Sequence, residues 1–274
     1  MKNILVPIDF SAASHNAGKY AVSLAEIFNA KVIFLNVVSQ TLIIDEEAAT
    51  ATISMHQELV IDNTDLMTKE TKSFSKNHKA KIQGYVEEGV PSDIILEMAN
   101  ENKPDMIIMG MKGKGKSNSV FGSTVTAIVR KSSIPVLIIP ENANYQSIDK
   151  ITFATDFNAG TESDRYSLLM EIAIKYNSFI QILNVQKKEI KISEKEFVGK
   201  MATHDAFKAL KHSFHTIEDR SVIEGINKFI EERPCEILVM MAQKHSFFER
   251  MLGKVYTKKM SYETRIPLLV LQDK

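Results

Sequence analysis

Glycine and lysine residues are concentrated between residues 110 and 123, directly after a short apolar run, and they alternate from Lys112 to Lys116. Glycine lets the backbone turn its N–H groups toward an anion. Gly122 and Ser123 open an amphipathic segment, whose first helical turn would add unpaired N–H groups and the positive end of a helix dipole. The same loop carries the positive charges of Lys112, Lys114 and Lys116. The pattern predicts a phosphate-binding site.

The letters from Gly110 to Ser117 also satisfy Gly-x4-Gly-Lys-Ser/Thr, which is the P-loop pattern. A P-loop needs a helix that begins at Lys116, and Gly122 would then fall in the second turn of that helix. No later strand of this half ends in an aspartate suited to Mg²⁺, because the apolar run 135–139 ends at Pro140. A P-loop enzyme therefore stays the alternative, and both interpretations place a triphosphate in this loop, with Lys116 as a phosphate contact.

Three blocks of sequence occur twice in the same order, which indicates duplication of one domain. The blocks that begin at Asn3, Lys103 and Ile134 return at Lys150, Arg233 and Ile266. A polar stretch, 141–147, separates the copies. The predicted domains are residues 1–142 and 148–274.

Each copy alternates short β-rich runs with longer helical segments. In the first copy, continuous apolar runs predict strands buried on both faces at 3–8, 31–37, 81–87, 105–109 and 135–139. Helices are predicted at 12–29 and 48–77 and after Pro91 and Ser123. This βαβ series predicts an α/β protein of two doubly wound domains, each a five-stranded parallel sheet flanked by helices. Ligands bind such sheets beyond the carboxyl ends of the strands, where Asp9 and the glycine loop are expected.

The same residues resemble the universal stress protein family. The resemblance is carried by Pro7-Ile8-Asp9 after the first strand, by Gly89-Val90-Pro91, and by the glycine loop that ends in Gly122-Ser123. It spans both halves, so the chain resembles a tandem member with the adenine nucleotide α-hydrolase-like fold. Nucleotide-binding members hold ATP phosphates with Gly-x2-Gly-x9-Gly-Ser/Thr. Here Gly110-x2-Gly113 fits, and eight residues rather than nine precede Gly122.

The resemblance also implies the roles of residues outside the loop. Pro7, Ile8 and Asp9 would border adenine and ribose, and Val37 would line the adenine slot. The candidate nucleotide-binding residues are Pro7, Ile8, Asp9, Val37, Met109, Gly110, Gly113, Gly115, Lys116, Gly122, Ser123 and Thr124. Neither a catalytic nor a metal-ligating residue is predicted.

The expected function is that of an ATP-binding regulatory protein of a stress response, with Mg²⁺ accompanying the nucleotide. Hydrolysis is expected to be slow at most, because the sequence offers neither a convincing base nor an arginine finger for in-line attack. Two alternatives stay open: a P-loop or adenylating enzyme that uses ATP, and a nucleotide-free assembly module.

The second copy lacks the glycine loop. Ala242 and His245 stand where the first copy has its first two glycines. A side chain there would strain or block a phosphate cradle. We therefore predict that residues 148–274 do not bind ATP and act as an intramolecular packing partner, and we leave a homodimer open.

Composition and charge limit the kinds of partner and the cellular location that the sequence predicts. The chain has 34 basic and 34 acidic residues, which argues against nucleic acid as the main partner. No apolar run reaches the eighteen or more residues of a spanning helix, so no membrane partner is expected. A single cysteine, Cys235, and the absence of a leader-like start predict a cytoplasmic location.

Several polar side chains have two interpretations. Asp9, Ser11 and Ser123 stand at predicted helix starts, so each either caps its helix or contacts a ligand. His212 and His215 lie three residues apart without a third ligand, which favours a surface helix face over a metal site.

Overall fold

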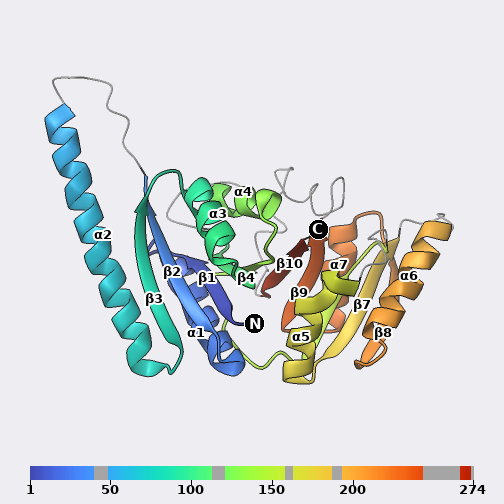
Figure 1. Ribbon diagram of the computed structural model, residues 1–274. Helices are drawn as coiled ribbons and strands as arrows, with labels where there is room; N and C mark the ends of the chain where they lie inside the picture. Colours follow the sequence, from blue (N-terminus) through green and yellow to red (C-terminus); the bar gives the residue numbers. More distant parts are fainter. Residues whose placement is uncertain (40–48, 113–120, 158–162, 187–192, 243–265, 273–274) are drawn as a thin grey trace. The chain divides into compact units, whose positions relative to one another are not determined.

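The computed structural model describes residues 1–39, 49–112, 121–157, 163–186, 193–242 and 266–272. The chain forms two compact units, Met1–Tyr145 and Gln146–Lys274. Both are α/β units that contain a five-stranded parallel sheet (Figure 1). The predicted fold class is confirmed.

In the amino-terminal unit the strands are β1 (Asn3–Pro7), β2 (Lys31–Val38), β3 (Lys81–Glu88), β4 (Met106–Gly110) and β5 (Val136–Ile139). They are arranged in the order β3-β2-β1-β4-β5, and all four pairings are parallel. The order reverses between β1 and β4, which makes the carboxyl ends of these two strands the expected ligand position.

Burial differs between the centre and the edge of this sheet. Ile4, Leu5 and Val6 of β1 and Ile107 of β4 are completely buried, as predicted for strands covered on both faces. The same prediction is wrong for β3, whose residues are mostly exposed. The physical reason is that β3 is the edge strand, and its Gly84 packs against Met67 and Thr71 of the helix that precedes it.

Four helices connect these strands: α1 (Ala12–Phe28), α2 (Ala49–Asn77), α3 (Pro91–Asn102) and α4 (Ser123–Lys131). Their boundaries follow local rules. Ser11 caps α1, a left-handed Asn29 ends it, and Pro91 occupies the first turn of α3. The helices α3 and α4 lie side by side in front of the sheet in Figure 1, and α1 lies behind it.

The second unit repeats this arrangement. Its strands are β6 (Lys150–Ala154), β7 (Phe179–Gln186), β8 (His212–Glu218), β9 (Ile237–Ala242) and β10 (Leu268–Gln272). They are arranged in the order β8-β7-β6-β9-β10, which is the strand order of the first unit. Its helices are η1 (Ser163–Tyr166), α5 (Ser167–Tyr176), α6 (Glu194–Phe207) and α7 (Val222–Glu232). The duplication inferred from sequence is therefore visible in the topology.

The two histidines expected on a helix face lie instead in β8. His212 and His215 belong to the edge strand, so the helical interpretation is wrong. The ring of His215 packs 5.0 Å from the ring of Phe229, centroid to centroid. This burial lowers the pKa of His215 below its usual value, and the nearby positive charge of Arg233 lowers it further.

The lowered pKa of His215 predicts a pH-dependent stability of the second unit. The folded unit binds fewer protons than the unfolded chain, so this stabilisation is complete above pH 6.5 and is lost as the pH falls through the folded pKa. We expect His215→Gln to weaken the pH dependence of the urea midpoint between about pH 7.5 and 5.5. Thr216→Ala, which changes an exposed residue of the same strand and keeps the imidazole, should retain it. An unchanged pH dependence in His215→Gln would contradict the assignment.

Candidate functional site

The carboxyl ends of β1, β2 and β4 border a cavity of about 340 Å³ in the amino-terminal unit. This volume lies within the range of small-molecule sites. Nine of the predicted nucleotide-binding residues line it: Pro7, Ile8, Asp9, Val37, Met109, Gly110, Gly122, Ser123 and Thr124. The other three, Gly113, Gly115 and Lys116, lie outside the described residues. The cavity thus gathers side chains from segments more than one hundred residues apart in the sequence.

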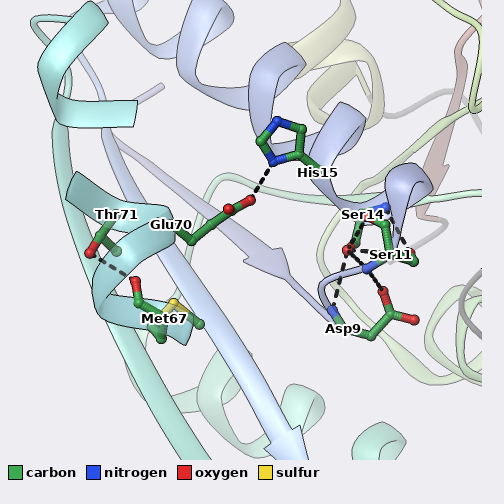
Figure 2. A network of polar contacts seen from close by, with 7 residues as sticks. All are labelled: Asp9, Ser11, Ser14, His15, Met67, Glu70 and Thr71. Atoms are coloured by element: carbon green, nitrogen blue, oxygen red, sulfur yellow. Dashed lines mark hydrogen bonds and ion pairs between the residues drawn. The ribbon is translucent and has the colours of Figure 1, made fainter. Parts of the chain in front are cut away.

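The turn after β1 places Asp9 at the cavity wall. Phe10 adopts a left-handed conformation with φ of 58°, and Ser11 then begins the cap of α1. The Ser11 N–H donates to Oδ1 of Asp9 at 3.1 Å, and the Asp9 N–H donates to Oγ of Ser14 at 3.3 Å (Figure 2). Ser11 is therefore the helix cap, whereas Asp9 closes the preceding turn and lines the cavity.

Asn36 is a cavity residue that the sequence analysis did not identify. Its Nδ2 donates to the backbone carbonyl of Ile8 at 2.7 Å, which ties β2 to the turn after β1. The side chain is only 5% exposed, and its Oδ1 has no hydrogen-bond partner among the described residues. A buried acceptor without a donor costs free energy. Asn36 therefore lines the cavity and holds β2 against the turn after β1.

The second unit repeats this tether. Nδ2 of Asn184 donates to the carbonyl of Thr155 at 2.9 Å. The sequence signal was present, because Leu-Asn-Val occurs at 35–37 and again at 183–185. The tether therefore belongs to the duplicated fold, whereas the glycine loop belongs to the first unit alone.

The first turn of α4 supplies backbone donors to the cavity. Gly122 is the helix cap, and its N–H donates to the carbonyl of Met111 at 3.0 Å. Ser123, Thr124 and Val125 follow as the first helical residues and line the cavity. N–H groups in a first turn have no partner within their own helix, and the helix dipole favours negative charge there. Ser123 is thus not the cap of its helix, and its position suits contact with an anion.

This helix start disfavours the P-loop interpretation. Phe121 and Gly122 are not helical, and α4 begins at Ser123. A P-loop would need a helix that starts at Lys116 and continues through these residues.

The charges at the cavity are few. Among the described lining residues, Asp9 is the one carboxylate and Lys112 the one cation. Apolar side chains that the sequence analysis did not assign, Leu35 and Ile95, complete the wall between β2 and α3. Within the described ranges, no cluster of three or more His, Cys, Asp or Glu residues is placed to hold a metal ion. The arrangement suits binding of an anion beside an apolar group.

In the second unit the strand that corresponds to β4 ends in a residue with a side chain. Ala242 is the last residue of β9, as Gly110 is of β4. His245, predicted to replace the second glycine, lies outside the described residues.

In the part of the chain that the structure describes, no helix has the length and hydropathy needed to cross a membrane.

Comparison with known proteins identifies relatives of both halves. Residues 1–140 match the universal stress protein family. Universal stress protein MJ0531 of Methanocaldococcus jannaschii is 32% identical over 141 residues, which cover 50% of this chain and 81% of that protein. Universal stress protein Slr1230 of Synechocystis is 23% identical over 297 residues and aligns with 99% of this chain and 100% of its own length.

Solved structures agree with the fold. The crystal structure of a universal stress protein from Archaeoglobus fulgidus superposes with a TM-score of 0.71 at 17% sequence identity. The superposition covers 99% of this chain and 98% of the other. The two-unit α/β architecture therefore recurs in a protein of low sequence identity.

Proposed function

This chain belongs to the universal stress protein family, in its tandem form, and on that premise we propose that its amino-terminal unit binds ATP. The observation that supports this proposal most strongly is the cavity at the reversal of strand order, bordered by the first turn of α4. The triphosphate would lie against the N–H groups of this turn and the glycine loop, and the base would lie toward Val37. Nucleotide binding would then alter contacts with a regulatory partner in a stress response.

The cavity fits the two chemical parts of a nucleotide. Leu35, Val37 and Ile95 offer an apolar wall for a base, and Asn36 lines the same part of the cavity. Lys112 and the α4 N–H groups offer positive potential for phosphates. Mg²⁺ would enter with the nucleotide, bound by phosphate oxygens and water.

Binding is favoured over catalysis. The single lining carboxylate, Asp9, accepts a hydrogen bond from the Ser11 N–H, and neither arginine nor histidine lines the described cavity. Such a site lacks the groups that accelerate phosphoryl transfer, so hydrolysis would be slow. The second unit, with Ala242 in place of Gly110, would act as a packing partner without ATP. The single cysteine supports a cytoplasmic location within the same proposal.

The direct test is to release and identify the small molecule that co-purifies with the protein and to count it per chain. One adenine nucleotide per chain supports the proposal. An absence of nucleotide, together with no binding of added ATP, favours the assembly module. A phosphate-release rate typical of an enzyme would instead favour the ATP-using alternative.

Ser123→Ala tests the phosphate end of the site. Loss of a hydroxyl that donates to a phosphate oxygen should weaken ATP binding by about 10- to 150-fold, measured by calorimetric titration. Thr126→Ala is the matched control on the same helix, because the Thr126 hydroxyl donates to the Gly122 carbonyl instead of lining the cavity. Equal affinities of the two variants would remove Ser123 from the site.

A further inference from the structure

The outer face of α2 carries two groups of exposed charges. An acidic group precedes the middle of the helix and consists of Glu58, Asp62 and Asp65. A basic group follows the middle and consists of Lys69, Lys72 and Lys76. Among the described residues, none of the six forms an ion pair.

The inner face of the same helix is occupied by its own unit. Met67 and Phe74 are buried, and Oε1 of Glu70 lies 2.5 Å from Nδ1 of His15 on α1 (Figure 2). At about 100° per residue, the six charged residues lie roughly 140–180° around the helix from this inner face. They therefore point away from the unit to which α2 is anchored.

Within one helix this order of charges is unfavourable. Glu58, Asp62 and Asp65 succeed one another at spacings of four and three residues, and the lysines do so at three and four. Like charges at these spacings repel, and only the step from Asp65 to Lys69 has the favourable order of acid before base. Within α2 only the Asp65–Lys69 step and Lys76 in the last turn are favourable, and opposite charges from another molecule would relieve the remaining repulsion.

The two groups are complementary to each other when the helix is reversed. Each acid has a lysine at the same distance on the other side of Met67: Glu58 with Lys76, Asp62 with Lys72, and Asp65 with Lys69. An antiparallel second copy of α2, related by a two-fold axis near Met67, would place every acid opposite a lysine. A two-fold interface requires this self-complementarity.

We propose that two copies of this chain associate through their α2 helices in antiparallel orientation. Met55, Leu59 and Leu66 form an exposed apolar stripe along one border of the charged face, and Met55 is 65% exposed. In the dimer the two stripes lie on the same side of the pair and run toward opposite ends, so they meet near the two-fold axis, where burial of Leu66 contributes affinity. The charges fix the orientation and the register.

The mixture of positive and negative charges on the outer face of α2 indicates which kind of molecule it binds. Nucleic acid and anionic membranes require a surface of one positive sign. Half of the charged residues on the outer face of α2 are acidic. The order of acids and lysines along the helix makes this face complementary to a reversed copy of itself. A second copy satisfies all six charges at once.

Two charge-reversal variants test the proposal. The acidic variant carries K69E, K72E and K76E, and the basic variant carries E58K, D62K and D65K. Each should repel its own copy and raise the dimer dissociation constant at least about 100-fold, measured by sedimentation velocity on the full chain. A one-to-one mixture should restore dimers, because the two faces are now opposite in sign throughout.

The control and the contrary outcomes are equally specific. Lys208→Glu with Lys211→Glu changes exposed charge in the second unit and should leave association intact. Wild-type dimers should weaken between about 0.05 and 1 M salt. The proposal is overturned if the wild-type chain is monomeric at low salt and 100 µM. It is also overturned if either variant dimerises as wild type, or if two variants that retain wild-type circular dichroism fail to pair when mixed.

Discussion

Gly110→Val is expected to abolish measurable ATP binding by the amino-terminal unit and to lower its free energy of unfolding by about 1–3 kcal/mol. A Cβ atom at position 110 would lie 2.7 Å from the carbonyl oxygen and 2.8 Å from the carbonyl carbon of Ala13. These are backbone atoms in the first turn of α1, so they cannot rotate away as a side chain would. The end of β4 and the start of α1 must separate, and both border the cavity.

The corresponding position of the second unit provides the control. Ala242 already has a Cβ at the end of β9, so Ala242→Gly should neither create a second ATP site nor change the first. In calorimetric titrations we expect Gly110→Val to weaken affinity by more than about 100-fold, which corresponds to about 2.7 kcal/mol. Wild-type affinity in a folded Gly110→Val protein would show that ATP binds elsewhere.

Most of the fold could be predicted because local patterns and the duplication pointed to the same answer. The predicted helices at 12–29 and 48–77 end within one residue of α1 and α2, since apolar periodicity and capping signals agree there. The predicted strand at 105–109 is Met106–Gly110 in the structure. Buried parallel strands leave long apolar runs, and such runs are the strongest signal in this chain.

The failures share a physical cause, which is dependence on contacts between distant segments. The run at 81–87 looked buried, but whether a strand is central or at an edge depends on the sheet order. His212 and His215 have a spacing compatible with one face of a helix. They lie in a strand because their segment pairs with β7.

Of the residues that line the cavity, those with local backbone signals could be predicted, whereas the supporting Asn36 could not. Glycines and a helix start leave local signals, so Gly110, Gly122 and Ser123 were identified from spacing. The role of Asn36 depends on a hydrogen bond to the carbonyl of Ile8, which lies 28 residues away. Likewise, Ser11 caps α1 instead of Asp9 because Phe10 adopts a left-handed conformation. The sequence pattern did not predict that conformation.

Phe74→Ala should cost about 3–5 kcal/mol of the free energy of unfolding, because this ring anchors α2. The side chain is 4% exposed, its ring centroid lies 5.3 Å from that of Phe34 and 5.2 Å from that of His15, and the absent side chain of Gly18 leaves room for it. Phe197→Ala on α6 removes the same atoms from a side chain that is 59% exposed, so it should change stability by less than about 0.5 kcal/mol. Urea denaturation followed by circular dichroism measures both variants. Equal costs would mean that the buried ring does not hold α2.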